Sequence, residues 1–117
     1  MSFDANLAMR VRRLLNRKAG YSERQMFGGI CFMLRGNMCG GVLNDDLIVR
    51  VKPDDYAPAL KRPHTRQFDF TGRPMKGFVV VRPKGCRSGK SFKDWIELGT
   101  KCARSMPVKN KNKEIKR

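Results

Sequence analysis

Several features of other protein classes are absent from this 117-residue chain. No apolar run approaches the roughly 18 residues of a membrane-spanning helix, and the N-terminus is polar, so we expect neither a secreted nor a membrane protein. The four cysteines form no CxxC pair, which argues against a zinc ribbon and against a disulfide framework. Reduced thiols fit a cytoplasmic location.

The chain also has few of the residues from which active sites are built. It has one histidine, His64, and no paired carboxylates or nucleophile triad, so we expect no catalytic residue, no cofactor and no metal. Gly28 and Gly29 are not followed by Lys-Ser or Lys-Thr, which excludes a Walker loop. No helix-turn-helix, zinc-finger or RNP motif is present.

Acidic residues are scarce as well. Ten Asp and Glu stand against 26 Lys and Arg, which gives a formal net charge of +16. Such a chain associates with polyanions, and the functional interpretation is a nucleic-acid partner. The alternative, that the charge serves only solubility, stays open at this point.

Three short apolar segments, 30–34, 38–43 and 47–51, predict a three-stranded antiparallel meander. Pairing Leu34 with Met38 and Leu43 with Leu47 places Cys31, Met33, Cys39, Gly41, Val49 and Val51 on one face. The opposite face is then also apolar and needs a cover, either a helix or another protein chain. Its residues are the predicted interface with a homodimer partner or a regulatory protein: Phe32, Leu34, Met38, Val42 and Ile48.

The remaining chain predicts three helices and two further strands. Residues 4–18 have helical spacing with Ser2 or Asp4 as N-cap, 53–60 form a short helix, and 91–106 form an amphipathic helix capped by Ser91 and anchored by Trp95. Segments 67–70 and 75–82 are predicted strands, and 21–25 a link. The result is an α+β domain over 1–106, with a five-stranded antiparallel sheet in the order α-β-β-β-α-β-β-α, and a basic, disordered tail over 107–117.

Basic residues are concentrated in two parts of the chain. Three arginines line one side of the first helix, and ten basic residues stand between Lys61 and Lys93 against a single acid, Asp69. Phosphate contacts from such residues give weak, salt-dependent binding without sequence preference. The candidate contacts are Arg10, Arg13, Arg17, Arg66, Arg73, Lys76, Arg82, Lys84, Arg87 and Lys90.

Cys86 is the best candidate for a reactive thiol. Lys84 and Arg87 flank it, and positive charge lowers a thiol pKa. An incidental loop cysteine is the alternative.

Two motifs resemble a known family. Met26-Phe27-Gly28-Gly29 leads into the predicted sheet and Gly72-Arg73-Pro74-Met75-Lys76-Gly77-Phe78 precedes the last strand, as in the TfoX/Sxy N-terminal domain family. The resemblance covers about residues 3–106 and implies a fold similar to secretion chaperones, in a short single-domain member. It implies a non-enzymatic accessory regulator or adaptor acting in transcription or competence regulation, and it implies no catalytic residues.

Overall fold

The computed structural model describes residues 3–26, 28–70 and 72–108. In these ranges the helices are α1 (Ala5–Leu15), α2 (Pro53–Leu60) and α3 (Gly89–Arg104), with a 3-10 turn, η1 (Pro83–Cys86). The strands are β1 (Tyr21–Met26), β2 (Gly29–Leu34), β3 (Asn37–Leu43), β4 (Asp46–Arg50), β5 (Thr65–Phe70) and β6 (Arg73–Val81). They form one antiparallel sheet in the order β1-β2-β3-β4-β6-β5, so the predicted α+β class is confirmed with one strand more than expected.

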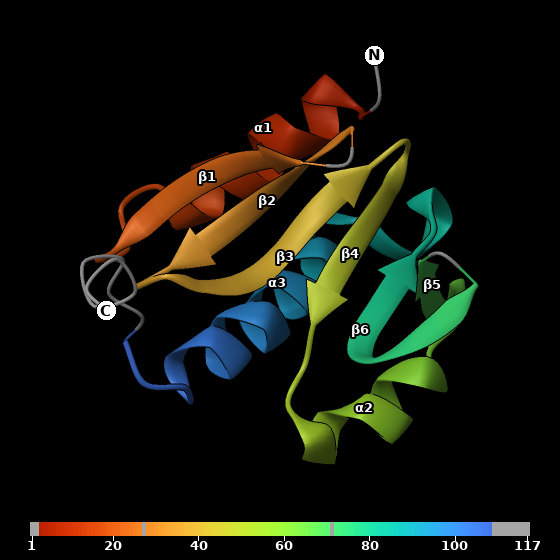
Figure 1. The fold of residues 1–117 in the computed structure, drawn as a ribbon. Coiled ribbons are helices and arrows are strands. Elements are labelled where there is room, and N and C mark those ends of the chain that lie inside the picture. Colours follow the sequence, from red (N-terminus) through yellow and green to blue (C-terminus); the bar gives the residue numbers. More distant parts are fainter. Residues whose placement is uncertain (1–2, 27, 71, 109–117) are drawn as a thin grey trace.

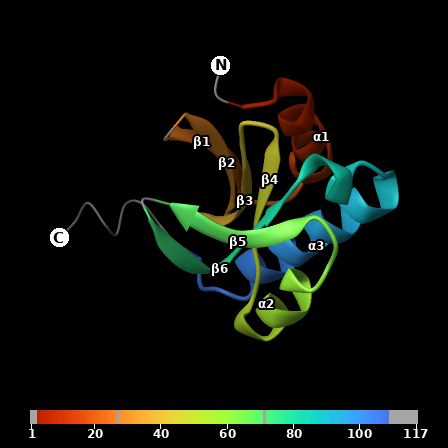
Figure 2. The same cartoon turned by 90° about the vertical axis from the view of Figure 1, so that its right-hand side faces the viewer.

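The molecule has two layers. Figure 1 shows α1 and α3 behind the sheet, and the turned view in Figure 2 shows all three helices on one side of it. We call this side the covered face. The opposite side, which no described helix overlies, is the bare face. No described helix is both long enough and apolar enough to cross a membrane.

The additional strand is β1, which the sequence predicted as a link. It pairs with β2 along its whole length, from Tyr21 opposite Leu34 to Met26 opposite Gly29. Most of its side chains are exposed because it lies at the sheet edge, so its sequence shows no apolar alternation. An edge strand of this kind carries no hydrophobic signal.

The helix ends correct one predicted cap and confirm another. Asp4 caps α1, and its Oδ1 accepts the N–H groups of Asn6 at 2.9 Å and Leu7 at 3.2 Å. In α3 the cap is Ser88 and not Ser91, since Ser88 Oγ accepts the N–H of Ser91 at 3.1 Å. The last helix therefore begins at Gly89, before the predicted start.

The strand register differs from the predicted one by a single step. Cys31 lies opposite Gly41 as expected, but Leu43 pairs with Asp46 instead of Leu47. A register shift between Phe32 and Met33 also sets Leu34 opposite Asn37. Because side chains alternate with a period of two, a one-residue slip moves a strand's apolar residues to the other face.

The consequence is a different division of the meander between the two faces. Phe32, Leu34, Val42, Cys39, Val49 and Val51 belong to the core, together with Val79 and Val81 of β6. Cys31, Met33, Gly41 and Ile48 fall on the bare face. The prediction that Cys39, Val49 and Val51 share a face with Cys31 is therefore wrong. The prediction that the five candidate interface residues share the opposite face is wrong as well.

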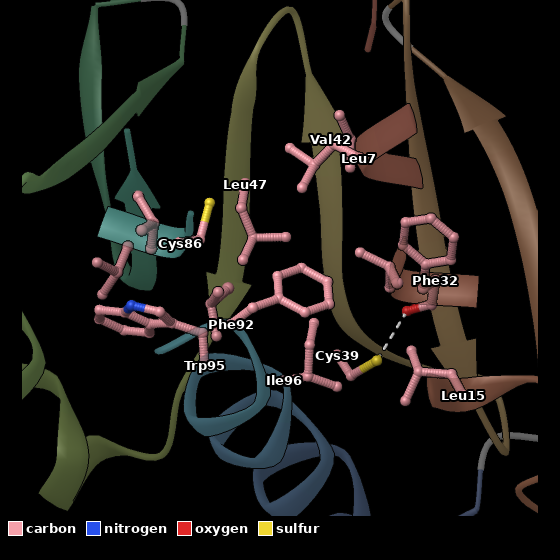
Figure 3. Close-up of a cluster of buried hydrophobic side chains, with 14 of the residues drawn as sticks. Leu7, Leu15, Phe32, Cys39, Val42, Leu47, Cys86, Phe92, Trp95 and Ile96 are labelled. Carbon is pink, nitrogen blue, oxygen red and sulfur yellow. Dashed lines mark hydrogen bonds between the residues drawn. The ribbon is translucent and has the colours of Figure 1, made fainter. Parts of the chain in front are cut away.

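The core lies between the covered face and the helices. Figure 3 shows Phe92 and Ile96 of α3 on the side of Phe32 and Leu47, whereas the ring of Trp95 points the other way, to the side of Cys86. Trp95 is 2% exposed, which agrees with its predicted role as an anchor. Gly99 lets α3 approach closely, because a Cβ there would lie 2.3 Å from the carbonyl oxygen of Cys39.

The packed part of the chain extends to the end of α3 and slightly beyond. Asn37, the first residue of β3, is buried, and its Nδ2 donates to the carbonyl of Pro107 at 2.8 Å. Residue 107 is thus held against the sheet although the predicted tail starts there. Residues 109–117, the rest of the predicted tail, lie outside the described residues.

Candidate nucleic-acid interface

One arginine joins three basic segments of the chain. Arg10 of α1 donates from Nη2 to the carbonyl of Cys86 at 3.1 Å and to that of Arg87 at 3.5 Å. Its guanidinium also lies 4.1 Å from the ring centroid of Phe92, in the first turns of α3. These contacts hold α1, η1 and the start of α3 together, and we call the basic residues at this place the η1 corner: Arg10, Arg82, Lys84, Arg87 and Lys90.

The corner carries more positive charge than its neighbours neutralise. Arg82 binds Asp46 through two contacts, at 2.9 and 3.1 Å, and Arg66 of β5 lies 3.8 Å from the same carboxylate. Lys84, Arg87 and Lys90 are exposed, and none forms an ion pair among the described residues. Three exposed cations within seven positions therefore remain available to a polyanion.

The other predicted contacts are spread over the molecule. Arg13 lies one turn after Arg10 on α1, while Arg17 follows the end of α1. Lys76 is exposed in the β5–β6 hairpin. The side chain of Arg73 lies outside the described part of the structure. Five of the ten predicted residues thus share the η1 corner, and Arg66 lies beside it at the Asp46 carboxylate.

Basic residues that the prediction did not include lie along α3. An open depression of about 930 Å³ follows its outer surface and is lined by residues of both signs. The basic ones are Lys18, Arg62, Lys93, Lys101 and Arg104, alternating with Asp94 and Glu97. Lys101 is bound to Asp55 at 3.3 Å, so this surface is more nearly neutral than the η1 corner.

All four cysteine side chains are buried. Cys86 is 2% exposed, its Sγ donates to the carbonyls of Arg82 and Pro83 at 3.8 Å, and burial raises its pKa although Arg10 partly opposes this. The predicted lowering of the Cys86 pKa is therefore wrong, because the side chain points into the core and away from Lys84 and Arg87. Burial likewise raises the pKa of Cys39 to about 12.

The predicted partner residues do not form one surface. Phe32, Leu34 and Val42 are buried under the helices, and only Met38 and Ile48 line the bare face. The bare face nevertheless holds an apolar groove of about 300 Å³, to which Phe68, Met75 and Phe78 also contribute. The signal available in the sequence was the alternation of Phe68 with its polar neighbours Gln67 and Asp69.

Comparison with known proteins bears on these observations. Residues 13–103 match the TfoX N-terminal domain, so the match spans more than half of the chain, from the last residues of α1 to the penultimate residue of α3. The chain belongs to the TfoX N-terminal domain family. No curated protein and no solved structure matches it.

Membership in this family confirms the resemblance seen in the sequence, and it indicates the general class of function. A TfoX N-terminal domain implies a regulatory, competence-related module. The predicted likeness to secretion chaperones stays a prediction. In this TfoX N-terminal domain the matched segment contains the whole sheet, and the contacts of Arg10 begin three residues before it.

Proposed function

We propose that this TfoX N-terminal domain is a non-catalytic, cytoplasmic regulatory adaptor that binds nucleic acid weakly and without sequence preference through the η1 corner. The observation that supports this most is the bridge from Arg10 to the carbonyls of Cys86 and Arg87. It makes one surface from cations that are far apart in sequence. The cytoplasmic part of the proposal is supported by four cysteines that form no disulfide.

The charge distribution supports affinity and argues against sequence readout. The exposed cations of the corner lie on a 3-10 turn and on the first turn of a helix. Side chains at these positions can contact a phosphate backbone. Specific readout requires side chains that reach base edges, usually from a helix lying in the major groove. The exposed side of α3 carries acids, Asp94 and Glu97, that a phosphate backbone would repel.

The test is fluorescence anisotropy with two duplexes of unrelated sequence at several salt concentrations. The corner variant is Lys84→Gln/Arg87→Gln/Lys90→Gln. Each lost phosphate contact should reduce the slope of log affinity against log salt by about 1, so the triple variant should lose about 3. Both duplexes should be affected equally.

The matched control is Arg17→Gln/Arg35→Gln/Arg104→Gln, which removes the same charge from exposed residues at the other end of α1 and α3. Its slope should change by less than about 1. Equal effects of the two triple variants would show that only net charge matters. A wild-type slope near zero would remove nucleic-acid binding from the proposal.

Binding to a regulatory protein, or formation of a homodimer, is the second candidate. It is supported by the apolar side chains of the bare face, although three of its five predicted residues lie in the core. Sedimentation at low and high salt distinguishes the two: a salt-insensitive dimer supports the interaction module. A monomer that changes only when DNA or RNA is added supports nucleic-acid binding.

A further inference from the structure

The groove on the bare face has the properties of a small-molecule site. Its volume of about 300 Å³ lies at the lower end of the range for such sites, which is about 300 to 1,000 Å³. Its lining is apolar throughout and comes from both halves of the sheet, with Met26 and Cys31 on one side and Phe68, Met75 and Phe78 on the other. The floor includes Gly41, where a Cβ would lie 2.7 Å from the carbonyl oxygen of Ile30.

Arginines stand around this apolar groove. One row of paired residues crosses all six strands on the bare face: Arg24, Cys31, Gly41, Ile48, Val80 and Arg66. The row is apolar in the middle and ends in an arginine on each edge strand. A third arginine, Arg50, lies opposite Phe78, with its guanidinium 5.6 Å from that ring's centroid.

Two of these arginines have no acidic partner. Arg24 and Arg50 form no ion pair among the described residues, whereas Arg66 is shared with Asp46. The charge of Arg24 acts on the groove, since it lowers the pKa of the Cys31 thiol against the larger opposing effect of burial. An occupant that combines an apolar body with one negative charge would satisfy both parts of this surface.

We infer that the groove binds a free medium-chain fatty acid, with its alkyl chain on the apolar floor and its carboxylate beside Arg50, which lies against the groove residue Phe78. The chain would be single, because the groove is small. Arginine is suited to the headgroup since its planar guanidinium can pair with a carboxylate through two hydrogen bonds. This inference does not rest on nucleic-acid binding, which involves the η1 corner.

A second copy of the chain is the competing occupant, and charge opposes it. Packing two bare faces together would bring the arginines of one rim toward those of the other, in molecules that each carry a net charge of +16. A fatty acid brings the opposite charge and removes apolar surface from water at the same time.

The experiment is a titration of the full chain with octanoate below its micelle concentration, followed by 1H–15N NMR. The backbone amides of Gly29 and Gly41 report on the groove, and those of Gly89 and Gly99, in α3, serve as internal controls. We expect saturable shifts at the first pair. Arg50→Gln should weaken octanoate binding about tenfold and leave binding of 1-octanol unchanged, because only the carboxylate uses the charge.

Met75→Ser and Met9→Ser form a matched pair of folded variants, since both side chains are exposed, 37% for Met75 and 45% for Met9. Met75 lines the groove, whereas Met9 is on α1 on the covered side, so only Met75→Ser should weaken binding, by about fivefold. Absence of saturable shifts at Gly29 and Gly41 would overturn the inference. So would shifts confined to the η1 corner, equal loss of octanoate and 1-octanol in Arg50→Gln, or a dimer that buries the groove.

Discussion

Both faces of the sheet carry apolar side chains, but the two faces differ in how far these side chains are excluded from water. On the covered face, side chains from β2 to β6 are almost completely excluded from water by α1 and α3, as Phe32 and Val79 show at 0% exposure. On the bare face, Met33, Leu43 and Phe78 are only half-buried, and the sheet itself shelters them. Apolar alternation therefore identifies a strand without showing which side of it supports the fold.

This difference in burial predicts how much a truncation on each face lowers the free energy of unfolding. A side chain packed on all sides leaves a cavity when it is truncated, and the cavity adds to the lost transfer free energy. A half-buried side chain on an open groove is replaced by water and leaves no cavity. The covered face should therefore dominate stability, and the half-buried positions of the bare face should tolerate change.

The largest expected effect compares neighbouring residues of β2. Phe32→Ala should lower the free energy of unfolding by about 3 to 5 kcal/mol, because its ring is fully buried against the helices. Met33→Ala, one position along and on the other face, should cost less than about 1 kcal/mol. Urea denaturation followed by circular dichroism measures both. Equal costs would contradict the division between the faces.

The next effect concerns how closely α3 approaches the covered face. Gly99→Ala should destabilise the fold by about 1 to 3 kcal/mol, since its Cβ would be 2.3 Å from the Cys39 carbonyl oxygen and the helix would have to move. Gly89→Ala, in the first turn of the same helix, meets nothing within 4 Å and should be neutral or slightly stabilising. Thermal unfolding of the two variants tests this. A neutral Gly99→Ala would mean that α3 is not held as described.

The smallest effect concerns the ion pair between Arg12 of α1 and Glu23 of the edge strand β1. Glu23 accepts a hydrogen bond from Arg12 and another from Tyr21, and the bond from Arg12 lowers the pKa of Glu23 below its usual value. A carboxylate whose pKa is lower in the folded state stabilises above the unfolded pKa of about 4.3, and this stabilisation is lost as pH falls through the folded pKa.

Glu23→Gln should therefore cost less than about 1 kcal/mol near pH 7, because the pair is partly exposed and screened. The difference from wild type should disappear in acid. Denaturation at a series of pH values measures it, with Glu97→Gln as the exposed control without an ion pair among the described residues. A difference that persists at low pH would exclude the ion pair as its cause.

Local patterns were sufficient for most of the architecture. The helical spacing of residues 4–18 predicted α1, and the apolar segments 30–34, 38–43 and 47–51 predicted the meander. The edge strand β1 escaped prediction because its exposed residues have no apolar period. The Ser88 cap was missed because two serines stand at the start of α3 and either could accept an amide.

For the candidate site, the residue types came from the sequence and the grouping came from the fold. Basic composition alone determined that this TfoX N-terminal domain carries a large positive charge. Only tertiary structure brought Arg10 to Cys86 and Arg87, 76 and 77 positions away, and only strand pairing decided that Val42 faces the helices while Ile48 faces the groove. The physical reason is that apolar periodicity is local, whereas a one-residue change in register, decided by pairing with other strands, reverses every side chain along a strand.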